Sequence, residues 1–440
     1  MPTYNETLKY LDAFVNYEKT GFDGLKKDFD LDKLRAVLKK MGDPHRDYRS
    51  AHVAGTKGKG SICAFTSSIL EEAGYCVGLY TSPHLATVAE RVKINNKNIE
   101  KEDLVRVIDR LRKHIGPAPD KEFTFFEIYT LAAMLYFSMK KVDFAVFETG
   151  MGGRLDATNV VDAEVCGMAP VSYDHTHVLG SRIEQIAREK SAIIKRGARC
   201  VSSPQRSRVL QVIERRCAEK EASLSLVGKD ITYNVSSSDE EGNYFDVYGE
   251  AGHYAKCRMR MLGDFQVANC ATAIGICEQL LGPEKNNRDA FRKGIERVFI
   301  PGRMEILSRR PFVVIDGAQN GDSAARLKNS VERIFRYDRL ILLVGISRDK
   351  DIESVCAQLA PLADEIVLSR ASVSRAADPG LIRGYIKGRR VTMTKDVKEG
   401  LGAAFSLAGK NDVILATGSF FLIGEVRKMI LGCDNKAGHL

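Results

Sequence analysis

The segment AHVAGTKGKGS, residues 51–61, decides the fold of this chain. Before its loop, Val53 and Ala54 have the apolar character of a buried strand, and after it apolar residues recur at helical spacing. Glycines in the loop allow successive backbone N–H groups to face one anion, and the following helix N-terminus and the Lys59 ammonium add positive charge. The segment therefore predicts a site for the phosphates of a nucleotide, made by Gly55, Thr56, Lys57, Gly58, Lys59, Gly60 and Ser61.

One detail differs from the strict P-loop pattern, which ends in Gly-Lys-Ser/Thr. Here Gly60 separates Lys59 from the hydroxyl group of Ser61. An isolated glycine-rich loop is more often a surface turn, but the strand before this loop and the helix after it favour phosphate binding.

The bulk properties indicate an intracellular protein that is long enough for two or three domains. The chain has 440 residues, a net charge of +9, and ten cysteines without a CxxC pair, which argues against zinc and against a disulfide framework. No apolar run is long enough for a membrane span, and residues 1–14 lack the features of a signal or transit peptide. We therefore expect a cytoplasmic protein without a membrane partner.

The positive charge has more than one interpretation. No basic patch interleaved with aromatic residues or other nucleic-acid motif is present, so we expect no nucleic-acid partner. A basic surface also attracts polyanionic substrates, although it is often no more than a solvated surface.

Short apolar strands alternate with amphipathic helices, which predicts an α/β fold with mainly parallel sheets. Residues 227–262 differ, because they predict a pair of β-hairpins inserted at a sheet edge, followed by a helix over 266–281. Strands are expected at Cys76–Tyr80, Asp143–Glu148, Glu164–Ala169, Arg199–Ser202, Phe312–Ile315, Leu340–Val344, Glu365–Leu368 and Val413–Ala416.

A domain boundary is expected near Ile300-Pro301-Gly302, where a new α/β cycle begins. Residues 1–299 would form a P-loop ATPase domain with a mainly parallel sheet and a small antiparallel insert. Residues 300–440, with helices near 321–335, 352–362 and 420–431, would form a Rossmann-like α/β domain of a typical size.

Chemistry-bearing residues follow several of these strands, where α/β sheets bind ligands. Glu148 ends a buried strand beside the phosphate loop, and a carboxylate there suits Mg²⁺, although it could instead cap a helix or pair with Arg154. His175 lies in VSYDHTHVLG, residues 171–180, and Ser82 in the turn before Pro83; each is a candidate metal ligand with a purely structural alternative.

Two further groups of residues are more ambiguous. Lys190 lies mid-helix, where a solvated face is the usual explanation. In the second domain, Asp316 follows a strand and could bind a ribose, while Arg303 at the junction could bind phosphate. GISRDKD at 345–351 and ATGSF at 416–420, which includes Ser419, end two more strands.

Taken in order, these motifs resemble the folylpolyglutamate synthase and dihydrofolate synthase family of the Mur-ligase superfamily. The resemblance spans nearly the whole chain and rests on HVAGTKGKGS, YTSPHL, TFFEIYTLAA, FETGMGGRLDATN, DHTHVLG, REKSAIIKRG, GDFQVANCATA, PGR, DGAQN, GISRDKD and ATGSFFLIGEV. It implies an ATP-dependent ligase of folate biosynthesis and one-carbon metabolism, in which ATP converts a carboxylate into an acyl phosphate that the amino group of L-glutamate attacks.

The resemblance also implies roles for individual residues. Magnesium would be bound at two sites by Ser82, Glu148, His175 and, if it is carbamylated, Lys190, and Lys59, Glu148, His175 and Lys190 would be the catalytic set. ATP would contact the loop together with Asn269, Arg303 and Asp316. The pocket for the pterin of dihydropteroate would be formed by Thr124, Phe126, Asp156 and Ala157, and Gln319 and Ser419 would also bind substrate. A monovalent cation could also bind. The family tends to be monomeric, so a monomer is expected.

Three positions depart from the family pattern. Lys57 replaces a common asparagine, Phe265 replaces a frequent histidine, and Gln319 replaces the histidine of Asp-Gly-Ala-His-Asn. Glutamine forms hydrogen bonds but carries no proton at neutral pH, so turnover or the preferred acceptor could differ. Two alternatives therefore stay open: a Mur-type ligase acting on a different acid, and a nucleotide-binding protein without ligase activity.

Overall fold

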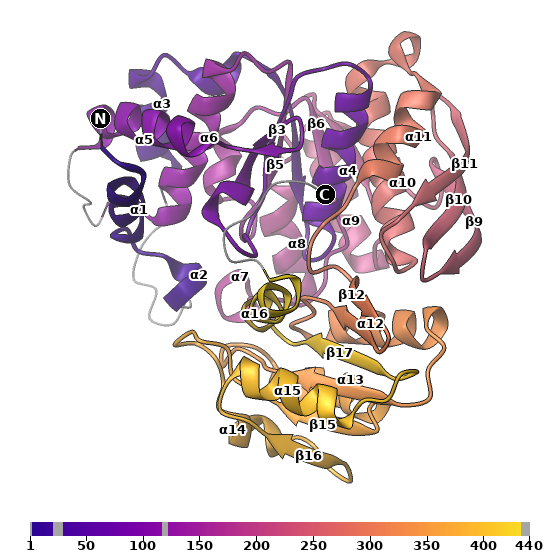
Figure 1. Cartoon of the computed structure of the whole chain (residues 1–440). Coiled ribbons are helices and arrows are strands. Elements are labelled where there is room, and N and C mark those ends of the chain that lie inside the picture. The colour runs from indigo at the N-terminus through magenta and orange to yellow at the C-terminus, as the bar shows by residue number, and fades with distance from the viewer. Residues whose placement is uncertain (1, 21–29, 117–121, 433–440) are drawn as a thin grey trace.

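A computed structural model describes residues 2–20, 30–116 and 122–432 of the chain. In it an N-terminal α/β body carries a small side sheet, and a second α/β body lies beneath it, as Figure 1 shows. The proposed boundary near residue 300 falls between the last helix of the first body and the first strand of the second.

The large sheet has the strand order β4-β3-β2-β5-β1-β6-β7-β8. All neighbours from β2 through β5, β1, β6 and β7 to β8 are parallel, while β3 pairs antiparallel with β2 and β4. Its strands are β1 (Arg49–Ala54), β2 (Val77–Tyr80), β3 (Val92–Ile94), β4 (Lys97–Asn98), β5 (Phe144–Glu148), β6 (Val165–Met168), β7 (Arg199–Ser202) and β8 (Ser223–Leu226).

Helices cover both faces of this sheet (Figure 1). They are α1 (Tyr4–Asp12), α2 (Tyr17–Thr20), α3 (Leu31–Lys40), α4 (Lys59–Glu72), α5 (Lys101–Ile115), α6 (Phe125–Met139), α7 (Thr176–Leu179), α8 (Ile183–Ser191), α9 (Ser207–Glu219), α10 (Phe265–Leu281) and α11 (Arg288–Arg297). Short 3₁₀ turns are η1 (Pro44–Arg46), η2 (Val88–Arg91), η3 (Ala157–Val160) and η4 (Pro283–Lys285).

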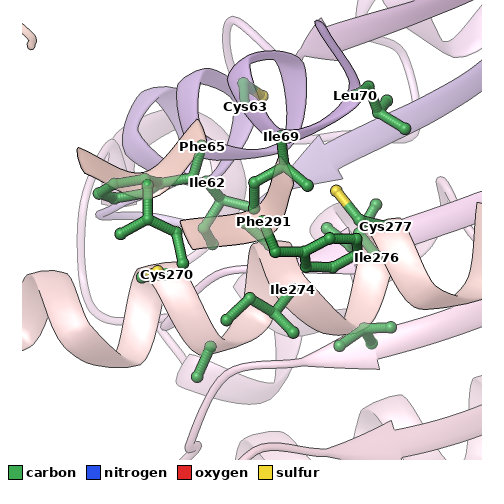
Figure 2. Packing of buried hydrophobic residues seen from close by; sticks show 14 of the residues in the cluster. Ile62, Cys63, Phe65, Ile69, Leu70, Cys270, Ile274, Ile276, Cys277 and Phe291 are labelled. Carbon is green, nitrogen blue, oxygen red and sulfur yellow. The ribbon is translucent and has the colours of Figure 1, made fainter. Parts of the chain in front are cut away.

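Strand β5 shows how the two faces are filled. Phe144 and Val146 pack into the cluster with α4, α10 and α11, whereas Ala145 and Phe147 face α5 and α6. This alternation follows from the two-residue period of a strand. Figure 2 shows the first cluster, in which side chains of α4 and α10 meet around Phe291 of α11.

The insert forms a sheet of its own. Strands β9 (Thr232–Asp239), β10 (Gly242–Tyr248) and β11 (His253–Met259) pair antiparallel in the order β11-β10-β9. The predicted hairpins are therefore present, but they pack against α10 and α11 rather than extending the edge of the large sheet.

The second body has the strand order β12-β13-β17-β14-β15-β16, parallel except for β12. Its strands are β12 (Glu305–Arg309), β13 (Phe312–Ile315), β14 (Leu340–Val344), β15 (Glu365–Leu368), β16 (Arg390–Met393) and β17 (Val413–Thr417). Its helices are α12 (Gly321–Ile334), α13 (Ile352–Leu359), α14 (Pro379–Arg383), α15 (Val397–Leu407) and α16 (Phe420–Leu431), with η5 (Ala360–Leu362) continuing α13.

The α/β fold class is as expected from the sequence. Side chains of α12 and α13 pack on one face of the second sheet, and those of α15 and α16 pack on the other. Within the described ranges no helix has the length and apolar character needed to cross a bilayer. The nine cysteines in these ranges are all free thiols.

Candidate functional site

A cleft of about 440 Å³ lies where the carboxyl ends of strands from both bodies meet. This is the location that α/β sheets use for ligands. Segments that follow β1, β2, β5 and β6 line it from the first body, and segments that follow β13, β14 and β17 line it from the second.

The predicted phosphate loop joins β1 to α4 as expected. The N–H groups of Thr56 and Lys57 donate to the carbonyl of Pro170, at 2.9 and 3.3 Å, so these two amides hold the loop in place. The N–H groups of residues 59–61 lie in the first turn of α4, where no intrahelical acceptor exists. The first turn of α4 is therefore the part of the loop that can receive an anion.

Two loop glycines have no room for a side chain. Gly58 has φ +87°, and a Cβ there would lie 3.0 Å from Cγ of Asn269 and closer still to its Oδ1. At Gly55 a Cβ would lie 2.5 Å from Cβ of Ala169. Asn269, which is buried in α10 and donates to Gln266 at 2.9 Å, therefore lies directly against the loop.

Glu148 lies at the end of β5, in register with Val53 of the neighbouring β1. Its Oε2 accepts the N–H of Ser82 at 3.0 Å, and a Cβ at Gly60 would lie 3.3 Å from the same oxygen. Burial raises its pKa, while Lys59, the Ser82 amide and Arg303 act in the opposite direction. Arg154 pairs with Glu189 at 2.9 Å instead, so the alternative of a Glu148–Arg154 pair is wrong.

His175 lies at the start of α7, beside Asp174. Burial lowers the pKa of His175 to about 3, although Asp174 acts in the opposite direction. The imidazole is therefore neutral near pH 7, which is the form that binds a metal.

Lys190 is buried rather than solvated, contrary to the usual expectation for a lysine in mid-helix. Its Nζ donates to the carbonyl of Gly55 at 2.9 Å, so α8 holds the lysine against the phosphate loop. Burial lowers its pKa to about 7, and the positive charges of Lys59 and Lys57 add to this effect. A substantial fraction of its amine is therefore unprotonated at neutral pH.

The predicted metal ligands do not form a closed cage. In the part of the chain that the structure describes, no three His, Cys, Asp or Glu side chains are grouped so that they could hold a metal ion. Ser82, Glu148 and His175 nevertheless all line the cleft beside the phosphate loop. Such a sparse oxygen-rich set suits Mg²⁺, which takes one or two carboxylates and completes its shell with phosphate and water.

An aromatic subsite lies at one end of the cleft. Phe126 stands over Gly150, where a Cβ would lie 2.6 Å from Cζ of the ring. Asp156 is buried and accepts the N–H groups of Met151 and Thr158, at 2.8 and 3.0 Å, so it caps η3. Its neighbour Ala157 is likewise buried and lines the cleft.

Thr124 has a structural role in this subsite. Its hydroxyl accepts the N–H of Glu127 at 3.2 Å, and its own backbone N–H donates to the Glu127 carboxylate at 2.7 Å, which closes a capping box at the start of α6. The cap fixes the first turn of α6, which carries Phe126, against the cleft.

Three predicted residues of the second body also line the cleft. Asp316 is buried and accepts the N–H groups of Met304 and Ala318, at 3.0 and 2.9 Å. Burial raises the pKa of Asp316, and the positive charge of Arg303 acts to lower it. The Arg303 guanidinium lies 4.6 Å from the ring centroid of Phe420, and Gln319 lines the cleft nearby.

Three predicted residues do not line the cleft, namely Gly55, Lys190 and Ser419. The first two contact each other behind the loop. Ser419 is buried and its hydroxyl accepts the N–H of Leu422 at 3.2 Å, so it caps α16.

Sequence reasoning missed a set of charged residues at the cleft. Arg91, whose side chain is 0% exposed, pairs with Glu18 and donates to Nδ1 of His84 at 2.8 Å. Arg375 of the second body donates to the carbonyl of Glu18 and pairs with Asp349 at 2.6 Å. These residues come from distant segments, so no local pattern could identify them.

Comparisons with known proteins agree with this architecture. A model of the Mur ligase middle domain matches residues 53–277, and a model of the Mur ligase glutamate ligase domain matches residues 302–420. The chain is 32% identical to dihydrofolate synthase/folylpolyglutamate synthase of Bacillus subtilis (strain 168), over 91% of this chain and 94% of that protein.

Solved structures are similar as well. The Mycobacterium tuberculosis folylpolyglutamate synthase complexed with ADP superposes with a TM-score of 0.88 at 28% identity, covering 97% of this chain and 98% of the other. The E. coli FolC protein in complex with DHPP and ADP gives a TM-score of 0.87 at 28% identity, covering 98% and 99%.

Proposed function

Because the chain belongs to the folylpolyglutamate synthase and dihydrofolate synthase family of Mur ligases, we propose that it joins L-glutamate to dihydropteroate, to reduced folates or to both. It is an ATP-dependent ligase that adds glutamate. The observation that supports the choice of acceptor is a single cleft that combines the phosphate loop and Glu148 with the aromatic subsite at Phe126.

In the proposed reaction, a carboxylate oxygen of the acceptor attacks the γ-phosphorus of ATP, ADP leaves, and an acyl phosphate forms. The amino nitrogen of glutamate then attacks the acyl carbon, phosphate leaves with the electrons of the C–O bond, and the nitrogen loses a proton. Both steps need charge neutralisation at phosphoryl oxygens. Lys59 and the amides of residues 59–61 supply it from the first body, and Arg303 brings a guanidinium from the second.

We assign a Mg²⁺ site to Ser82, Glu148 and His175. The Glu148 carboxylate lies against the loop, and the low pKa of His175 keeps its imidazole neutral. When bound, Mg²⁺ supplies charge neutralisation to the phosphates. We assign no residues to a monovalent cation.

We assign Lys190 to a second Mg²⁺ site as its carbamate. Carbon dioxide reacts with an unprotonated amine, and burial produces that form here by lowering the pKa to about 7. Peptide mapping of protein kept in bicarbonate tests this assignment: a carbon dioxide adduct on Lys190 is expected, and an unmodified lysine under those conditions contradicts it.

We assign the pterin ring to the subsite around Phe126, where an aromatic side chain can stack on a flat heterocycle. Asp156 uses its carboxylate to cap η3 and, at 6% exposed, still borders the cleft, so it is placed to accept from a ring amino group. Gln319 and Arg303 border the side of the cleft that the second body supplies, where we place glutamate and ATP.

We also propose that the protein works as a monomer in the cytoplasm. The free thiols of its described cysteines agree with a reducing compartment. Sedimentation of the purified protein tests the monomeric state, since a dimer at micromolar concentration contradicts a monomer.

Phosphate release from MgATP tests the proposed function. We expect release only when L-glutamate is present together with dihydropteroate or tetrahydrofolate, and the preferred acid identifies the activity. Release that needs glutamate but neither pterin acid would instead favour a Mur-type ligase with another acceptor.

A further inference from the structure

Asp174 lies at the junction of the two bodies and has partners in both. Its Oδ2 accepts from Nζ of Lys57 at 3.2 Å and from Nδ2 of Asn320 at 3.3 Å, and its Oδ1 lies 3.5 Å from Nζ of Lys350. Lys57 belongs to the phosphate loop, whereas Asn320 and Lys350 follow β13 and β14 of the second sheet. One carboxylate therefore connects the nucleotide site to the other body.

The charges at this junction do not balance. Lys57 and Lys350 share Asp174, and among the described residues neither lysine has another carboxylate within ion-pair distance. The side chains of Asp174 and Lys350 are only 13% and 7% exposed, so water screens them weakly. The cluster therefore carries one excess positive charge, directed at a cleft that would receive phosphate.

The Asp174 carboxylate lies within ion-pair distance of both ammonium groups and accepts a hydrogen bond from Lys57. Without the carboxylate, two poorly hydrated ammonium groups from different bodies would repel each other.

We propose that Asp174 is a positioning residue that holds Lys57 and Lys350 as one cationic pair across the two bodies, so that Lys350 joins the phosphate site only when the bodies are together. The inference rests on the proposed function, because it requires ATP at the loop. It assigns Lys57, which stands where the family commonly has asparagine, a second role beyond adding charge to the loop.

A double-mutant cycle tests the inference. Dissociation constants for a non-hydrolysable ATP analogue with Mg²⁺ are measured by calorimetry for the wild type, Lys350→Met, Asp174→Asn and the double variant. We expect Lys350→Met to weaken binding about tenfold in the wild type and less than about twofold in the Asp174→Asn background. The conservative Asp174→Glu variant should restore part of the coupling. Equal losses in both backgrounds would overturn the proposal.

A matched control and a second readout complete the test. Glu241→Gln breaks an exposed ion pair with Arg309 that also joins the two bodies, at 2.7 Å, and should leave nucleotide affinity unchanged. In small-angle scattering, nucleotide should compact the wild type and Glu241→Gln but not Lys350→Met. Compaction of Lys350→Met equal to that of the wild type contradicts the proposal even if Asp174→Asn fails to fold. A wild type that binds no nucleotide would instead refute the proposed function.

Discussion

Substituting alanine for Gly58 should damage the phosphate loop without unfolding the protein. Gly58 has φ +87°, a conformation that costs a residue with a Cβ about 1–2 kcal/mol. A Cβ there would also lie 3.0 Å from Cγ of Asn269, so the loop or Asn269 has to shift. If the loop relieves the strain by rotating its backbone, nucleotide binding must return the loop to its original conformation. Binding then bears the cost of about 1–2 kcal/mol, which predicts a loss of affinity of about 5–30-fold.

The chain supplies a matched control for this prediction. Gly42 has φ +85°, and a Cβ there would meet nothing within 4 Å. Gly42→Ala therefore carries the same backbone cost of about 1–2 kcal/mol in unfolding free energy but no collision near the cleft.

Urea unfolding and calorimetry with an ATP analogue separate the two effects. We expect Gly58→Ala to lose at least as much stability as Gly42→Ala, and only Gly58→Ala to lose nucleotide affinity. Wild-type affinity in Gly58→Ala, or an equal loss of affinity in Gly42→Ala, would refute the reasoning.

Three other predictions concern single side chains. Glu148→Gln keeps an oxygen for the amide of residue 82 but loses the charge, so glutamate-dependent phosphate release should fall at least about 100-fold with unchanged thermal stability; a variant above a tenth of wild-type activity contradicts the metal assignment. His52 is buried with Nδ1 unpartnered, and burial lowers its pKa to about 3. Because the unfolded chain takes up this proton below about pH 6.5, the stability that the neutral imidazole provides is complete above that pH and is lost as the pH falls toward 3, by about 2 kcal/mol at pH 5. Urea unfolding of the wild type and His52→Gln at pH 7.5 and 5 measures this loss of stability. An identical pH dependence of stability in the two proteins would count against its assignment to His52. Gln319→His should be tolerated, since the residue lines the cleft and its side chain forms no hydrogen bond with another described residue, and complete loss of ligase activity in that variant contradicts this account.

Local patterns predicted the elements that carry the phosphate site. The strand, glycine loop and helix at residues 49–72 are set by apolar spacing and by glycine, both of which are visible in a short window. The edge strands β4, β8, β12 and β16, and β3 beside β4, were not predicted, because these short strands are partly exposed and carry polar residues such as Lys97 and Arg390.

The charges of the site could not be predicted in the same way. The position of Lys190 in the middle of a helix predicts a solvated face, and only the packing of α8 against Gly153 and the phosphate loop buries it. Asp174 meets Lys57 and Lys350 across 117 and 176 residues of sequence, so its role depends on how the two bodies meet.

The most direct test of the central claim follows the oxygen atoms of the acceptor. Dihydropteroate or tetrahydrofolate labelled with ¹⁸O in the reacting carboxylate is incubated with MgATP, L-glutamate and the enzyme, and the released phosphate is examined by mass spectrometry. Ligation through an acyl phosphate predicts that each phosphate carries one labelled oxygen and that the new amide retains the other. Amide formation accompanied by unlabelled phosphate would contradict the account.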